Sequence, residues 1–166
     1  GPIAFKLTLM REQRPDLFEH SLQMVLVSMF LGIKSGMSER ECVPLVAAAL
    51  LHDMGVLHMA PEWRDRKHKV TGAERKQLVA HPITSMLMVR DAQVYPRSVE
   101  MAVLEHHERM DGTGYPRGLA GPQISPMGRI LLLAEVVSAF FEKNTDTPGQ
   151  QLSLALRLNH RKFPSE

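Results

Sequence analysis

The segment from His106 to Gly118 joins two adjacent imidazoles to a loop rich in glycine and proline that carries Arg117 near its end. Imidazole is the commonest side-chain ligand for metal ions, so two in succession are hard to explain by packing alone. Glycine lets the backbone approach a ligand closely, and a guanidinium offers a forked donor to phosphate or guanine. The segment therefore predicts a place where metal chemistry and phosphate recognition meet.

A second polar pair, His52 and Asp53, ends an apolar run that begins near Val46. Unpaired charge is costly in apolar surroundings, which makes this pair a candidate for metal binding as well. Neighbouring side chains on a helix point about 100° apart, so the pair cannot hold one ion from a single helix face. A cluster of two or more metal ions, with further ligands from a facing helix, removes that difficulty.

In type and order, four features resemble the HD-GYP family: His52-Asp53, His81-Pro82, His106-His107 and the loop 112–118, which reads Gly-Thr-Gly-Tyr-Pro-Arg-Gly. The resemblance extends over about residues 18–143, nearly the whole chain. Members of this family are bacterial, metal-dependent phosphodiesterases that hydrolyse cyclic dinucleotides, chiefly cyclic di-GMP, in second-messenger signalling. The resemblance implies an all-α, HD-superfamily helical bundle with a Gly/Pro-rich GYP loop. It also implies hydrolysis of cyclic di-GMP to linear pGpG, to GMP, or to both.

The resemblance assigns roles to the polar residues as well. Asp53 is the implied catalytic residue and bridges two ions. For His20, the role of a hydrogen-bonded imidazole in the core remains an alternative to metal binding. Imidazole and carboxylate ligands without thiolate suit two or three divalent ions, of which iron or manganese is expected and nickel or zinc is compatible. The implied metal ligands are His20, His52, Asp53, His81, His106, His107 and Glu135, and the implied substrate contacts are Gly114, Tyr115, Pro116, Arg117 and Lys143.

The chain also departs from the family pattern. Val56 stands where members typically have a lysine that touches the scissile phosphate, and a valine can neither donate a hydrogen bond nor neutralise charge. The basic residues at 64–69 could replace that lysine. Glu135 stands where members usually have aspartate, and further differences fall at or near family positions occupied here by Leu17, Ser138 and Asn144. These differences predict reduced activity.

Three functions remain open on these residues. The first is a metal-dependent cyclic-dinucleotide phosphodiesterase. The second is a catalytically impaired domain that acts as a nucleotide or metal sensor, or that docks to other signalling proteins such as diguanylate cyclases. The third is a phosphohydrolase of mononucleotides, which needs only the His-Asp core but leaves His106-His107 and the GYP loop unexplained.

Helical patterns position these residues. Apolar side chains near a 3.6-residue period predict a helix over 17–34, ended by Gly36. Capping boxes at Ser38 and Thr71 predict two further helices. The first delivers His52-Asp53 and stops at Gly55, and the second is expected to adjust at His81, with Pro82 in the first turn of another helix. Additional helices are expected at about 98–106, 127–141 and 148–160.

Composition sets the remaining expectations. We expect one domain over residues 1–166, with a core at 17–144 and a C-terminal helix at about 148–160, as a piece of a longer protein. A formal net charge of +2 offers no footprint for a nucleic-acid polymer. The single Cys42 predicts a reduced, cytoplasmic setting. No run approaches the ~20 uninterrupted apolar residues of a membrane span, so no membrane contact is expected.

Overall fold

The computed structural model describes residues 2–59 and 69–144 of the chain. These residues form an all-α fold and contain no strand, so the predicted fold class is confirmed. The predicted C-terminal helix at about 148–160 lies outside them. The described elements are α1 (Pro2–Gln13), α2 (Pro15–Lys34), α3 (Glu39–Leu51), the 3-10 helix η1 (Met54–His58), α4 (Gly72–Ala92), α5 (Arg97–Glu105), the 3-10 helix η3 (Gly121–Gln123) and α6 (Pro126–Asn144).

The helix starts follow local chemistry that is legible in the sequence. Both predicted capping boxes are present, with the backbone N–H of Glu41 donating to Ser38 Oγ and that of Glu74 donating to Thr71 Oγ1. The N-terminal helix α1 was not predicted, because few of its side chains follow an apolar period. It buries Met10 fully beneath the rest of the fold.

The prediction that Gly55 ends the third helix is wrong. Helix α3 ends at Leu51, and Gly55 lies inside η1. A β-carbon at Gly55 would stand only 2.9 Å from the His81 backbone oxygen, and the Gly55 N–H donates to Ser85 Oγ at 2.8 Å. Glycine is therefore required here for the close approach of η1 to α4, rather than for stopping a helix.

The expected break at His81 is also wrong, because α4 runs without interruption through Pro82. A proline lacks the N–H that would bond the carbonyl four residues earlier, which here belongs to Leu78. The His81 side chain compensates, since its Nδ1 bonds the Leu78 carbonyl oxygen. The same contact fixes the direction of the His81 ring.

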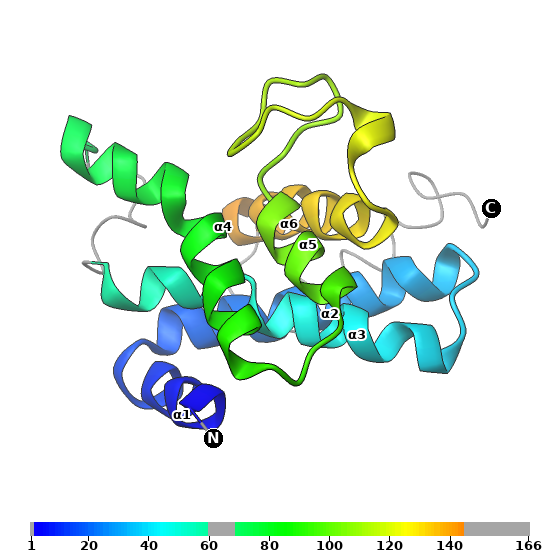
Figure 1. Cartoon of the computed structure of the whole chain (residues 1–166), viewed down its shortest axis with the longest axis horizontal. Coiled ribbons are helices and arrows are strands. Elements are labelled where there is room, and N and C mark those ends of the chain that lie inside the picture. The colour runs from blue at the N-terminus through cyan, green and yellow to red at the C-terminus, as the bar shows by residue number, and fades with distance from the viewer. Residues whose placement is uncertain (1, 60–68, 145–166) are drawn as a thin grey trace.

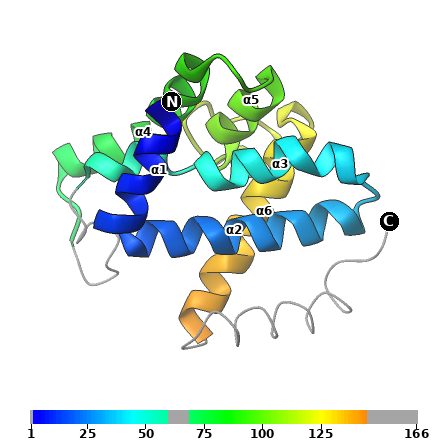
Figure 2. The ribbon, with the colours of Figure 1, turned by 90° about the horizontal axis from the view of Figure 1, so that it is seen from below.

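The core lies where the helices cross. Helix α2 packs against α3 and α6, and α5 packs against α3, α4 and α6. Figure 2 shows α6 crossing behind α2, and Figure 1 shows the loop between α5 and α6 standing out above the helices. Among the described helices, α2 is the one with the length and apolar composition of a membrane span, but 44% of its apolar window is buried in the fold.

Candidate metal centre

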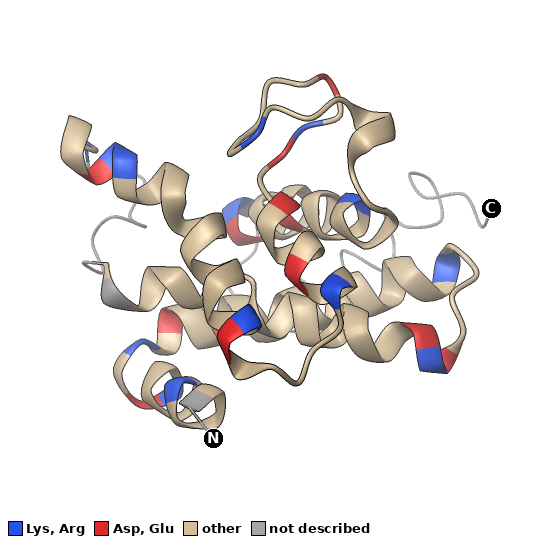
Figure 3. Ribbon diagram, in the orientation of Figure 1, with Lys and Arg blue, Asp and Glu red and all other residues tan. Residues whose placement is uncertain are grey.

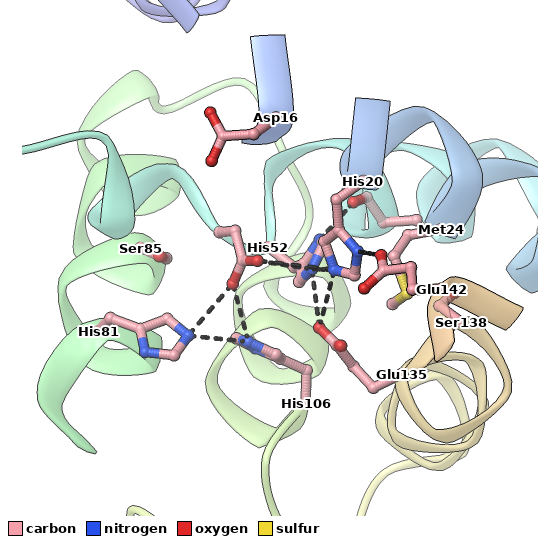
Figure 4. A network of polar contacts seen from close by, with 12 residues as sticks. Asp16, His20, Met24, His52, His81, Ser85, His106, Glu135, Ser138 and Glu142 are labelled. Atoms are coloured by element: carbon pink, nitrogen blue, oxygen red, sulfur yellow. Dashed lines mark hydrogen bonds and ion pairs between the residues drawn. The ribbon is translucent and has the colours of Figure 1, made fainter. Parts of the chain in front are cut away.

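Five helices deliver polar side chains to one buried region. His20 comes from α2, and His52 comes from the end of α3 (Figure 4). Asp53 follows His52, directly before η1. His81 lies in the middle of α4, His106 and His107 follow α5, and Glu135 lies on α6. The structure thus brings together all seven of the predicted metal ligands. Five are buried, and His107 and Glu135 are half-buried.

Asp53 lies at the centre of this region, and its two carboxylate oxygens face different partners. Oδ1 is 3.1 Å from His81 Nε2 and 3.4 Å from His106 Nε2. Oδ2 is 3.3 Å from His52 Nε2 and 3.7 Å from His20 Nε2. Glu135 Oε1 closes the second side, at 2.9 Å from His52 Nε2 and 3.5 Å from His20 Nε2.

The side chains therefore form two clusters that share Asp53. The first cluster contains His20, His52, Asp53 and Glu135, and the second contains Asp53, His81, His106 and His107. Within each cluster, one ligand atom per residue lies within 4.8 Å of all the others. Either cluster could hold a metal ion on four side chains.

Three of the imidazoles are oriented by backbone carbonyls three residues earlier. The Nδ1 atoms of His52 and His106 bond the carbonyls of Ala49 and Val103, both at 2.6 Å, as His81 bonds that of Leu78. A carbonyl oxygen only accepts, so Nδ1 must carry the proton, and in the neutral ring Nε2 is a lone pair. Such outer contacts orient histidines that ligate metals.

His20 is held differently, because its Nδ1 lies 2.9 Å from a carboxylate oxygen of Glu142. His20 lies on α2 and Glu142 lies on α6, so this contact exists only in the folded chain. The imidazole still presents Nε2 to the shared centre.

Electrostatics separate the two clusters. Burial alone would lower the pKa of His20 and His52, but carboxylates outweigh it: Glu135 raises the pKa of His20 to about 9, and Asp53 raises that of His52 to about 10. The same histidines hold the pKa of Asp53 and Glu135 well below the usual range, against the effect of burial. Burial lowers the pKa of His106 in the second cluster.

The donor set fits divalent metal ions. Asp53 Oδ1 is buried and has no hydrogen-bond partner among the described residues. The two Nε2 atoms of His81 and His106 that face it lie only 3.3 Å apart, and their protons are committed to Nδ1. Lone pairs that converge in a buried space, with no donor between them, are stabilised by a cation.

The GYP loop lies against the second cluster. The Tyr115 ring stacks on His107, with centroids 5.0 Å apart and planes 19° apart, and the Tyr115 N–H donates to the His107 carbonyl. Burial, reinforced by the charge of Asp53, raises the pKa of Tyr115 to about 12, so the phenol keeps its proton. A β-carbon at Gly114 would lie 2.4 Å from the Arg109 nitrogen, so only glycine fits there. Pro116 follows in a cis peptide bond.

Comparison with known proteins identifies the fold. Residues 8–162 of the chain match the sequence pattern of the HD domain family. The chain belongs to the HD-domain family. It is 32% identical over 120 residues to the cyclic di-GMP phosphodiesterase PdeB of Borreliella burgdorferi, covering 72% of this chain and 31% of that protein. It is also 32% identical to the 3'3'-cGAMP-specific phosphodiesterase 3 of Vibrio cholerae, covering 84% of this chain and 30% of that protein. The recognition of an HD-GYP domain from sequence is confirmed.

Solved structures show the same HD fold. The HDG"Y"P protein Bd1817 of Bdellovibrio bacteriovorus matches with a TM-score of 0.68 at 21% identity, covering 87% of this chain and 47% of that one. The HD domain of the L. monocytogenes phosphodiesterase PgpH, in complex with cyclic-di-AMP, matches with a TM-score of 0.66 at 12% identity, covering 93% and 82%. The chain spans about a third of the length of the curated relatives it matches.

The residue that replaces the expected lysine is not at the surface of this HD domain. Val56 is 4% exposed and packs in the apolar core. Its backbone carbonyl and that of Met59 accept hydrogen bonds from Arg14, at 3.5 and 2.7 Å, and the other side of the same guanidinium pairs with Asp16. Arg14 is thus a buried cation that anchors η1. Of the basic residues suggested as substitutes, Lys69 is exposed, and those at 64, 66 and 67 lie outside the described residues.

Two predicted substrate contacts, Arg117 and Lys143, are distinct from two positions at which the chain departs from the family pattern, Ser138 and Leu17. Arg117 lies in the loop and pairs with Glu105 at 3.2 Å, whereas Lys143 is exposed in the last turn of α6. Ser138 is fully buried, with Oγ 3.5 Å from Met24 Sδ. Leu17 is also fully buried.

Sequence reasoning overlooked four polar residues that organise the site: Arg14, Glu105, Glu108 and Glu142. The two glutamates that flank His106-His107 offered a signal, since charged residues next to apolar helix positions need partners when buried. Arg14 and Glu142 gave none, because their partners are distant in the chain.

Proposed function

We propose that this HD domain hydrolyses a phosphodiester bond of a cyclic dinucleotide, with cyclic di-GMP as the first candidate. The observation that carries the proposal is the division of the Asp53 carboxylate between two four-residue clusters, one on each oxygen. A carboxylate shared in this way can hold two ions close together beside one substrate. The named relatives act on cyclic dinucleotides, which supports this substrate class.

The first cluster would hold one ion through His20, His52, Asp53 and Glu135, and the second would hold another through Asp53, His81, His106 and His107. When bound, a pair of divalent ions lowers the pKa of a bound water toward neutrality and acts as a Lewis acid toward a phosphate. Asp53 fixes the two positions relative to each other. The carbonyl contacts of Nδ1 keep the Nε2 atoms of His52, His81 and His106 aimed inward before any ligand arrives.

The GYP loop would hold the dinucleotide beside this centre. Tyr115 presents a protonated phenol next to His107, and Arg117 presents a guanidinium that is 43% exposed. Lys143 would add a charge from α6. Basic and acidic residues are mixed over the elements (Figure 3), so recognition of the dinucleotide depends on such local groups rather than on a broad basic face.

The metals we propose are iron or manganese, in two positions. Imidazoles with carboxylates and no thiolate suit these ions, and nickel or zinc would also be accepted. A third ion would need ligands beyond the two clusters, and the nearby Asp16 is already paired with Arg14.

The decisive experiment is turnover of cyclic di-GMP by the purified chain, loaded with Mn²⁺ or with Fe²⁺ under anaerobic conditions. Metal content is measured in the same samples. We expect about two ions per chain, and formation of pGpG or GMP that stops when a chelator removes them. Full metal loading without any hydrolysis would contradict the proposal.

A second candidate is a domain that binds cyclic di-GMP without cleaving it, as a sensor or as a docking module for proteins such as diguanylate cyclases. The buried Val56 favours it, because no lysine is available at that position. Equilibrium binding separates the candidates: a metal-loaded chain that binds cyclic di-GMP tightly, and returns it intact, supports the second. Cleavage of mononucleotides is disfavoured, since it would leave the loop against His107 without a role.

A further inference from the structure

Two buried carboxylates flank the paired histidines and belong to neither metal cluster. Glu105 directly precedes His106, Glu108 directly follows His107, and each is 2% exposed. Both carboxylates contact the segment that follows in sequence, between residues 117 and 125. Glu108 accepts hydrogen bonds from the backbone N–H groups of Arg117 and Leu119, at 2.8 and 2.9 Å. It therefore fixes the backbone of the GYP loop at Arg117.

Glu105 holds the side chain of the same arginine. Its Oε2 accepts from Arg117 Nη2 at 3.2 Å, while Oε1 accepts from both the backbone N–H and the hydroxyl of Ser125, at 3.1 and 2.5 Å. Gly128 leaves the room for this carboxylate, because a β-carbon there would lie 2.5 Å from Glu105 Oε1. The carboxylate is thus fixed on one side by the start of α6 and on the other by the loop.

The guanidinium is only partly used by this contact. Within residues 2–59 and 69–144, its one polar contact is the Nη2 bond to Glu105, so its other N–H groups have no partner there. The side chain is 43% exposed, in the same loop as the Tyr115 ring that stacks on His107. Arg117 therefore offers an oriented fork of donors whose positive charge is already balanced by a buried carboxylate.

We propose that Glu105 and Arg117 form a guanine-reading pair, in which Glu105 is the positioning residue and Arg117 contacts the base. This inference rests on the proposed function and names the base that the site selects. A charge-balanced guanidinium adds little attraction for phosphate, but its donors still match the two acceptors of guanine, O6 and N7. Adenine presents an amino donor beside N7, which opposes a fork that can only donate.

The experiment compares cyclic di-GMP with cyclic di-AMP for the metal-loaded chain, for three single variants and for the double variant that combines Glu105→Gln with Arg117→Lys. Arg117→Lys keeps the charge but loses the fork, and Glu105→Gln keeps the size but loses the ion pair. Arg109→Gln removes an exposed charge from the segment just before the loop and serves as the matched control. Both kcat and KM are measured for each dinucleotide, together with metal content.

We expect the wild type to prefer cyclic di-GMP in kcat/KM, and Arg117→Lys to lose about 5- to 100-fold of that preference. Glu105→Gln should lose part of it through KM, with kcat and metal content unchanged. The double variant should lose no more than Arg117→Lys alone, because the two residues act as one unit. Arg109→Gln should keep the wild-type preference.

Equal losses for both dinucleotides would overturn the proposal, since they would assign Arg117 to phosphate. An unchanged preference in both variants would overturn it too, while leaving the phosphodiesterase proposal intact. If the wild type cleaves neither dinucleotide, the preference is measured instead as the ratio of the dissociation constants of cyclic di-AMP and cyclic di-GMP. A guanine preference that Glu105→Gln weakens then supports the pair even though the proposed activity has failed, and equal or absent binding overturns it.

Discussion

Replacing Asp53 by asparagine tests the shared centre most directly, because the two carboxylate oxygens serve different clusters. Oδ1 faces His81 and His106, and Oδ2 faces His52 and His20. An amide keeps one oxygen and exchanges the other for an NH₂ group, which cannot ligate. One cluster therefore falls from four ligands to three, and both lose the negative charge.

The expected magnitude follows from this geometry. Loss of an outer contact to a ligand typically costs ~10–100-fold in metal affinity. Loss of a ligand itself should cost at least the upper end of that range at the cluster facing the NH₂ group, or roughly 3 kcal/mol at about 1.4 kcal/mol per factor of ten. We therefore expect Asp53→Asn to retain at most one ion per chain, and turnover to fall by at least ~10³-fold when both ions are needed.

The assay is metal content after dialysis against a fixed concentration of free Mn²⁺, followed by turnover of cyclic di-GMP on the same samples. Asp16→Asn is the matched control, since it makes the same chemical change on α2 near the centre, at a carboxylate paired with Arg14 (Figure 4). If Asp53→Asn holds as much metal as the wild type, the carboxylate is not shared and the reasoning fails.

Three further outcomes are expected. Val56→Lys should raise turnover, by up to ~10²-fold for a well-placed donor, but should lower Tm because the side chain is buried. Val56→Met, assayed for turnover and for Tm, separates the effect of the charge from that of the added bulk. If Val56→Lys turns over no faster than the wild type, the missing lysine is not what limits the site. Gly55→Ala should destabilise the fold by about 1–3 kcal/mol in denaturant unfolding and reduce metal content, since its β-carbon would meet α4. Gly72→Ala has open space around it and should change neither, so equal effects of the two would refute this account. In chelator, Tm should fall as pH rises from about 7 to 10, because the pKa values of His20 and His52, about 9 and 10, lie above their ordinary 6.5. The stabilisation from the two charged histidines is complete below pH 6.5 and is lost as the pH rises through their raised pKa values. Replacing either histidine by glutamine should weaken this pH dependence, and a wild-type Tm that does not change between about pH 7 and 10 would contradict the expectation.

Local chemistry determined much of this protein in advance. The helix starts at Ser38 and Thr71 and the loop after His107 follow from short-range patterns, because capping and turn formation depend on neighbours in the chain. The identity and order of the candidate metal ligands follow from the resemblance to the HD-GYP family. The all-α fold follows from apolar periodicity and from residues that favour helices. These features are legible without any knowledge of long-range contacts.

Other features were decided only by tertiary packing. The continuous α4 through Pro82 depends on a side-chain bond from His81 that local propensity does not foresee. The division of the Asp53 oxygens requires four helices to meet, since neither oxygen has a preference until the histidines face it.

The contacts that orient the site are likewise distant in the chain. Arg14 reaches η1, Glu142 holds His20, and Glu105 joins Arg117 to the start of α6. A buried charge must find its partner, but the sequence names neither the partner nor the burial. The sequence by itself therefore determined which groups could bind metal and phosphate, and the tertiary structure determined which atoms of those groups face one another.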